Sequence, residues 1–338
     1  MFRRCYVAIF LLALLPALPA IGSAAQESLP DFVALIDAED VMSHVRALSV
    51  AVGTRPMGSE AEARAAGYVA AALEDWGYAV EIQTFETSPP SAEEGAEPEP
   101  VVSRNVVAVK PGDEQIVVVG AHLDSERVGA GAGDNASGVA AMLATARALA
   151  DVDTTHTLVF VAFGAEEGGD PTGAAVYVES LGNEIENVVA MLNIDTVGIG
   201  TNLNVYAGAV VTWPEADAED QAPVIEGGPV WVRDAALDLA AEMGLPFGTS
   251  PAETWGGFTG DWSDHYEFVL AGVPVAYFEA WQWEGAEDPW WGQETADGDV
   301  LGTERDIYEN VVPEKVEMMA EVIAATTAAI ATGRVAAP

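Results

Sequence analysis

The sequence predicts an α/β fold in which helices cover both faces of a parallel or mixed β-sheet. Short and nearly continuous apolar segments recur along the chain, and helical sequence separates them. Strands that are buried on both faces are apolar throughout, and their alternation with helices is typical of α/β domains. A chain of 338 residues without an internal repeat forms one or two such domains.

The first element is a helix that begins behind the capping pair Ser59 and Glu62 and continues to about Trp76. The strand AVEIQTF follows it. Further strands are expected at 115–121, 156–163, 187–194 and 272–278. Helices are expected at about 137–150, 173–181 and 230–243, and a last helix runs from about Pro313 to Ala331.

The segment 88–100, SPPSAEEGAEPEP, is rich in proline and glutamate and has almost nothing to bury. It is therefore predicted to be an acidic, Pro-rich surface loop. The helical segment before it lacks enough strands for a core of its own. The loop is thus expected to interrupt one domain, spanning 26–338, instead of joining two.

Residues 1–25 have the layout of a secretory signal peptide. Arg3 and Arg4 precede the apolar run from Tyr6 to Ile21, and small residues follow up to Ala25. A membrane anchor is the alternative, but a spanning helix needs roughly 20 apolar residues. We expect cleavage near Ala25, a secreted or periplasmic location and no membrane anchor in the mature form.

The charge and the cysteine content exclude several classes of function. Removal of two arginines with the signal changes the net charge from −41 to −43, which disfavours binding to nucleic acid or anionic lipid. Such an acidic chain stays soluble in salt, so a saline habitat is one hypothesis. The only cysteine lies within the predicted signal, which excludes disulfides and a thiol nucleophile from the mature chain.

Polar residues follow three successive core strands at the point where each strand ends. Because open α/β sheets bind ligands at the carboxyl ends of their strands, these side chains are expected to share one edge. Those residues are His122, Asp124, Glu166, Glu167 and Asp195, and Asp134 joins them from the loop GAGDNASG before a helix.

Each of these residues alone has a simpler interpretation as a helix cap or a turn residue. Several carboxylates at one sheet edge, however, repel one another unless a proton or a cation neutralises them. Imidazole and carboxylate together suit zinc. Asp134 is expected to bridge two ions, and Asp124 is well placed to hold the second ring nitrogen of His122. One glutamate of the pair would bind metal while its neighbour accepts the proton of the attacking water.

Five motifs in this order resemble the aminopeptidase Y family of co-catalytic zinc metallopeptidases, of the bacterial secreted type. They are AHLDS (121–125), GAGDNASGVA (131–140), FGAEEGG (163–169), NIDTVG (193–198) and SDHYEF (263–268). The resemblance covers nearly all of the mature chain. It implies a single domain with a mixed, mostly parallel, twisted sheet of about eight strands and helices on both faces, the zinc aminopeptidase or phosphorylase-like fold.

The resemblance also implies two zinc ions. His122, Asp134 and Asp195 would surround one, Asp134 and Glu167 would hold the other, and Glu166 would be the general base. The catalytic residues expected are then Glu166 and Asp124.

One position departs from the pattern of the family. A second histidine normally completes the second zinc site, and Gly302 of GTERDIYENV stands in its place. A different alignment puts Glu294 or Gln293 near the metal. Among the four histidines, His265 is the remaining candidate, although the histidine of SDH usually neighbours the site without binding metal. His44 and His156 are expected to lie away from it.

The function expected is removal of amino-terminal residues from peptides or small aminoacyl substrates by metal-activated water. A single-zinc acyltransferase resembling glutaminyl cyclases and a non-catalytic binding ectodomain of the same fold are the alternatives. Four tryptophans follow the strand at 272–278 and either line a pocket for a bulky apolar side chain or pack a loop. They are Trp281, Trp283, Trp290 and Trp291.

Overall fold

A computed structural model describes residues 31–91, 98–214, 222–283, 292–295 and 298–338. The predicted signal peptide lies outside these residues, as do Trp290, Trp291 and residues 92–97 of the predicted loop. No helix in the described part of the chain combines the length and apolar content needed to cross a membrane.

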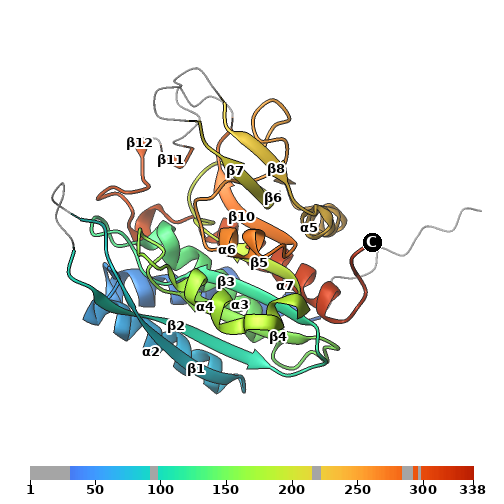
Figure 1. The fold of residues 1–338 in the computed structure, drawn as a ribbon, viewed down its shortest axis with the longest axis horizontal. Helices are drawn as coiled ribbons and strands as arrows, with labels where there is room; N and C mark the ends of the chain where they lie inside the picture. Colours follow the sequence, from blue (N-terminus) through green and yellow to red (C-terminus); the bar gives the residue numbers. More distant parts are fainter. Residues whose placement is uncertain (1–30, 92–97, 215–221, 284–291, 296–297) are drawn as a thin grey trace, which may run out of the picture.

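A single eight-stranded sheet forms the centre of the molecule (Figure 1). In spatial order its strands are β1 (Ala79–Thr87), β2 (Val101–Lys110), β4 (Thr157–Phe163), β3 (Ile116–His122), β5 (Val188–Ile194), β10 (Val275–Trp281), β6 (Asn202–Ala207) and β9 (Phe247–Gly248). The central strands β4, β3, β5 and β10 are parallel, whereas β1, β2 and β6 pair in antiparallel fashion with their inner neighbours. The predicted mixed, mostly parallel sheet of about eight strands is therefore confirmed.

Two strand pairs lie outside this sheet. They are β7 (Ala209–Thr212) with β8 (Val224–Gly227), and β11 (Glu294–Thr295) with β12 (Gly298–Asp299).

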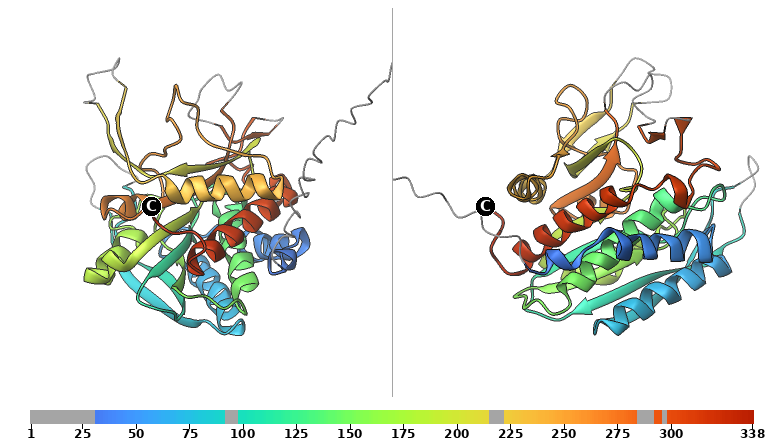
Figure 2. Two further views of the ribbon diagram at one scale, coloured as in Figure 1. Left: turned by 90° about the vertical axis from the view of Figure 1, so that its right-hand side faces the viewer. Right: turned by 180° about the vertical axis from the view of Figure 1, so that it is seen from behind.

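Helices cover both faces of the sheet, as predicted (Figure 2). One face carries α1 (Ala38–Arg46), α2 (Glu60–Asp75), α3 (Gly138–Leu149), α5 (Trp231–Met243) and α7 (Pro313–Ala331). The other face carries α4 (Gly173–Leu181) and α6 (His265–Leu270). Short helical turns lie at Val33–Leu35, Ala47–Val52, Ala132–Ser137, Gly182–Asn187 and Tyr308–Asn310.

The central strands are apolar throughout because each of their faces enters a different core. Val117 and Val119 of β3 pack among the helices of the larger face, whereas Val118 packs with α4 and α6. On β4, Phe160 and Phe163 divide in the same way. Burial of both faces thus accounts for the continuous hydrophobic strands from which the fold class was predicted.

The predicted cap of α2 is present, but Glu62 also has another role. The Ser59 hydroxyl accepts the backbone N–H of Glu62 at 3.1 Å. The Glu62 carboxylate is fully buried, and it accepts the N–H of Gly58 at 2.8 Å and hydrogen bonds from Ser103 and Arg104. Burial raises its pKa to about 7.

Replacing Glu62 by glutamine is expected to change the pH dependence of stability. Folded wild type keeps the carboxyl protonated up to about pH 7, whereas the unfolded chain ionises it from about pH 4.5. Wild type therefore loses stability over this range, and the non-titrating variant does not. The free energy of unfolding of Glu62→Gln relative to wild type should rise by about 2–3 kcal/mol between pH 4.5 and 7. Urea unfolding across this range measures it, and a pH-independent difference would contradict the assignment.

Candidate active site

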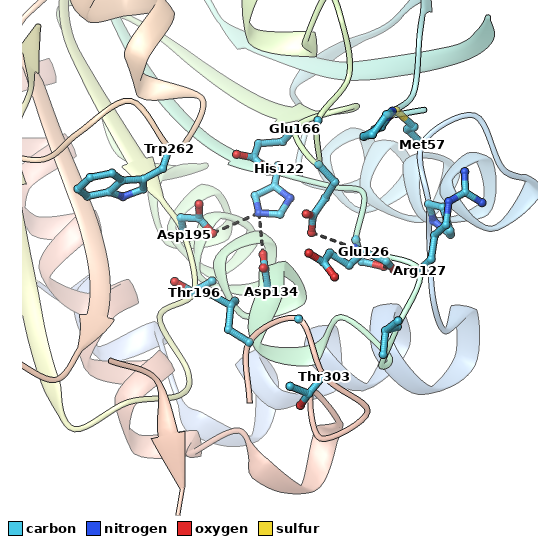
Figure 3. A pocket seen from close by; sticks show the side chains of 18 of the residues that line it. Met57, His122, Glu126, Arg127, Asp134, Glu166, Asp195, Thr196, Trp262 and Thr303 are labelled. Carbon is cyan, nitrogen blue, oxygen red and sulfur yellow. Dashed lines mark hydrogen bonds and ion pairs between the residues drawn. The ribbon is translucent and has the colours of Figure 1, made fainter. Parts of the chain in front are cut away.

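The ends of the parallel strands bring the predicted site residues together. β3 ends at His122, Glu166 and Glu167 follow β4 after a short turn, and Asp195 comes directly after β5. Asp134 reaches the same place from the helical turn that precedes α3. Figure 3 shows the side chains of His122, Asp134, Asp195 and Glu166 around one cavity.

His122 is the centre of the first group of possible ligands. Its Nε2 atom lies 2.9 Å from a carboxylate oxygen of Asp134 and 3.2 Å from one of Asp195. One ring N–H cannot satisfy both carboxylates well. With metal–ligand bonds of about 2.0–2.2 Å, tetrahedral zinc ligands lie about 3.3 Å apart, which is close to these spacings. The donor types and their spacing both fit a zinc ion.

A second group shares His122 with Glu166 and Glu167. One potential ligand atom from each of these residues lies within 4.8 Å of the others. Asp124 fixes the backbone of this group. Its carboxylate accepts hydrogen bonds from the backbone N–H groups of Glu166 and Glu167, at 3.1 and 3.3 Å. Its oxygen lies 3.8 Å from Nδ1 of His122, too far for a hydrogen bond but close enough to orient the buried ring electrostatically.

Hydrogen bonds hold the other ligand candidates in place. The Ser263 hydroxyl donates to Asp195 at 2.7 Å and receives the side-chain N–H of Asn193. Asn135, next to Asp134, donates to the carbonyl of Ile194 at 2.9 Å, which ties the helical turn to the end of β5. The candidates therefore sit on a preorganised frame, as metal ligands require.

Asp306 holds the backbone at Asp134 by hydrogen bonds. Its carboxylate accepts the backbone N–H of Gly133 at 2.5 Å and that of Asp134 at 3.2 Å. The side chain is buried, and burial together with the nearby charge of Asp134 raises the pKa of Asp306 to about 6. Asp306 thus fixes the backbone that carries the proposed bridging ligand.

Replacing Asp306 by alanine is expected to weaken zinc binding about 10- to 100-fold, because residues that orient ligands have effects of this size. Competition against a chelating dye measures the affinity. Asp238→Ala removes an exposed carboxylate of α5 and should leave the affinity unchanged. Equal affinities in Asp306→Ala and wild type would show that Asp134 is held by other contacts.

Arg55 is a buried cation beneath this site. It is fully buried, and its guanidinium donates to the carbonyls of Leu123, Ala130 and Gly131 at 2.9 Å and of Gly53 at 3.3 Å. The Arg55 side chain therefore holds the backbone of the loop between His122 and Asp134.

The site gathers several carboxylates around one imidazole. Burial raises the pKa values of Glu166 and Glu167 well above their usual range, and neighbouring carboxylates raise them further. Burial alone lowers the pKa of His122, but Asp195, Glu166 and the other carboxylates around it raise that pKa well above its usual value. Carboxylates gathered in this way need protons or a cation, and a divalent metal supplies the charge they lack.

His265, the other histidine considered as a ligand, makes contacts outside the two ligand groups. His265 is buried, but its Nε2 pairs with the carbonyl of Gly260 at 2.8 Å and its ring packs on Tyr277, so it does not join either ligand group. Burial lowers its pKa to about 4. This geometry argues against His265 as an additional ligand.

The structure describes the side chain of Gln293 but only the backbone of Glu294. Gln293 donates to the hydroxyl of Thr196 at 2.6 Å, at the wall of the cavity. The backbone of Glu294 lies in β11, and its side chain is outside the described structure. His44 and His156 contact Tyr68 and Asp113, away from the ligand groups, as expected.

A cavity of about 1150 Å³ opens above the ligand candidates. Trp281 and Trp283, two of the four tryptophans singled out in the sequence, line its wall, and Trp255 and Trp262 join them. Glu279 adds a buried carboxyl whose pKa burial raises to about 8. The cavity therefore combines an aromatic wall with an acidic floor.

Several residues of this site were not found by sequence reasoning. Arg55 lies in a short segment rich in glycine and proline that carries no motif. Asp306 lies in the segment GTERD, in which only Gly302 departs from the pattern of the family. The acidic residues Glu126 and Glu279 also line the cavity. Their signal was the proximity of Glu126 to the HLDS motif and the position of Glu279 at the end of a predicted strand.

Comparison with known proteins now identifies the family. The model of peptidase family M28 matches residues 105–327, which is more than half of the chain. The chain belongs to peptidase family M28. This membership confirms the resemblance noted from the five motifs. This M28 chain is similar to aminopeptidase YwaD of Bacillus subtilis, with 29% identity over 229 residues that make up 66% of this chain and 44% of that protein.

Solved structures resemble the M28 chain over most of its length. A zinc aminopeptidase from Bacillus subtilis superposes with a TM-score of 0.65 at 20% identity, covering 89% of this chain and 95% of the other. The glutaminyl cyclase of Porphyromonas gingivalis superposes with a TM-score of 0.66 at 21% identity, covering 86% and 98%. At these identities the likeness establishes the M28 fold alone. The chain spans about half the length of the curated relatives it matches.

Proposed function

We propose that this M28 chain is an exported zinc aminopeptidase, with residues 1–25 acting as a removable signal and 26–338 forming the peptidase domain. The observation that carries the proposal is the convergence of His122, Asp134 and Asp195 next to the half-buried pair Glu166 and Glu167. A binding module has no need for a proton acceptor beside a metal site. The aminopeptidase names of several relatives support the same function.

His122, Asp134 and Asp195 would hold one zinc ion, and Glu167 would join Asp134 at a second. When bound, zinc polarises the scissile carbonyl and lowers the pKa of water. Glu166 is the general base in this proposal. Its carboxylate lies beside His122 and Glu167, where it can take a proton from water and then give it to the leaving amine.

Specificity for a free amino terminus follows from the remaining charges. A substrate ammonium entering the cavity meets the carboxylates of Asp195 and Glu166, whereas an acylated amine brings no compensating charge. The tryptophans on the cavity wall would contact the first side chain of the substrate. Peptides and small aminoacyl compounds are the proposed substrates.

The proposal is tested by product release from matched aminoacyl anilides that carry either a free or an acetylated amine. Cleavage of the free compounds alone, lost with a chelator and restored by zinc, supports a metalloaminopeptidase. Formation of pyroglutamate from an amino-terminal glutaminyl peptide without hydrolysis would instead establish the cyclase alternative. Absence of both reactions in folded, metal-loaded protein would contradict both catalytic functions and favour the binding alternative.

A further inference from the structure

Gly302, the residue that stands in place of the expected histidine, lies in the wall of the cavity. A β-carbon added to Gly302 would lie 3.5 and 3.7 Å from the two carboxylate oxygens of Glu126. The space that a side chain at position 302 would enter is therefore next to an acidic group supplied by another part of the chain.

The backbone of Glu126 is hydrogen-bonded to the site, and its side chain is directed into the cavity. Its N–H donates to Oε1 of Glu167 at 2.9 Å, and its carbonyl accepts the Ser125 hydroxyl at 3.1 Å. Figure 3 shows the Glu126 carboxyl group turned toward Asp134. Asp134, Glu167, Glu126 and Gly302 all line the same cavity, and the exposed side chain of Glu126 has room to move within it.

We propose that Glu126 takes the place of the missing imidazole and completes, with Asp134 and Glu167, a second metal position made of carboxylates alone. This inference rests on the metal centre of the proposed function. It differs from the sequence expectation, which placed Glu294 or Gln293 near the gap. Gln293 points its amide at Thr196 instead.

The all-oxygen ligand set changes which metal the second position selects. Carboxylates, carbonyls and water suit Mn²⁺, Mg²⁺ and Ca²⁺, whereas imidazole suits zinc. The first position keeps His122 and therefore retains its preference for zinc. The centre is thus expected to be mixed, with zinc at His122, Asp134 and Asp195 and an exchangeable, harder cation at Glu126.

Metal content tests this inference without reference to activity. Protein stripped with a chelator is given one equivalent of Zn²⁺ and then an excess of Mn²⁺, because zinc outcompetes manganese at most sites when the two are equally available. The metals per chain are measured by mass spectrometry and by Mn²⁺ electron paramagnetic resonance. We expect about one zinc and one manganese in wild type. In Glu126→Gln and Glu126→Ala the zinc should remain, and the affinity for manganese should fall at least about 10-fold.

Two further variants sharpen the test. Glu304→Gln removes an equal charge from an exposed residue close to Gly302 in sequence and should bind both metals as wild type does. In the double variant Glu126→Ala, Gly302→His, an imidazole enters the space that Glu126 has left. Histidine is among the residues that tolerate the positive φ of +65° found at Gly302. When each metal is titrated alone, the ratio of zinc affinity to manganese affinity at the second position should be higher in this variant than in wild type.

The outcomes separate this inference from the proposed function. Wild-type manganese affinity in Glu126→Ala, with zinc still bound, would overturn the role of Glu126 and leave the proposed function intact. Failure of folded wild type to bind either metal would overturn both the role of Glu126 and the proposed function. A double variant whose second position binds no more zinc than Glu126→Ala would contradict the placement of residue 302 beside that position.

Discussion

Glu166→Gln is expected to lower kcat for a free aminoacyl anilide by about 10²–10⁴-fold, the usual contribution of a general acid–base residue. Glutamine keeps the size of the side chain and its hydrogen-bonding capacity, but it cannot take a proton from water. The proposed ligands His122, Asp134 and Asp195 are unchanged in this variant. Zinc content should therefore equal that of wild type, and KM should change much less than kcat.

A matched control distinguishes loss of the base from loss of charge. Glu179 is an exposed glutamate of α4, and Glu179→Gln should retain wild-type kcat. If Glu166→Gln lost its zinc together with its activity, Glu166 would be a ligand instead of the base. If it kept a wild-type kcat, proton transfer would have to be assigned to another residue.

Arg55→Met is expected to reduce the free energy of unfolding by about 3 kcal/mol or more. The change leaves four carbonyls without their charged donors: those of Leu123 and Gly131, which are buried, and those of Gly53 and Ala130, which are partly buried. Each hydrogen bond to a charged group contributes about 1.5–3 kcal/mol, although these contributions are not fully additive. Urea unfolding at saturating zinc measures the loss.

Arg64 provides the matched control for Arg55. It is an exposed arginine of α2, so Arg64→Met should change stability by less than about 0.5 kcal/mol. Arg55→Lys should fall between wild type and Arg55→Met, because one ammonium cannot reach carbonyls on four residues. Equal stabilities of Arg55→Met and Arg64→Met would show that the loop is held by other contacts.

The core of the fold could be predicted because its signals are local. Continuous apolar segments marked β3, β4, β5 and β10, and each lies within a few residues of its expected range. β2 was not predicted as a strand, because Ser103, Arg104 and Asn105 interrupt its apolar pattern. These polar residues are explained only by distant partners, since Ser103 donates to Glu62 and Asn105 donates to Gly173.

The site shows the same division between local and distant signals. Residues directly after strand ends, such as His122 and Asp195, could be placed at one edge because parallel strands align their carboxyl ends. Arg55 could not be found in this way, because its partners are backbone carbonyls that leave no trace in residue types. The proximity of Glu126 to Gly302 could not be found in this way either, because it brings together segments that are far apart in the sequence.

Anomalous diffraction at the zinc absorption edge, from crystals grown with zinc, tests the central claim most directly. The account predicts a zinc peak bonded to Nε2 of His122 and to carboxylate oxygens of Asp134 and Asp195, at about 2.0–2.2 Å. The account would be contradicted by a zinc ion bound elsewhere. It would also be contradicted if, in excess zinc, His122 kept direct hydrogen bonds to Asp134 and Asp195 with no metal between them.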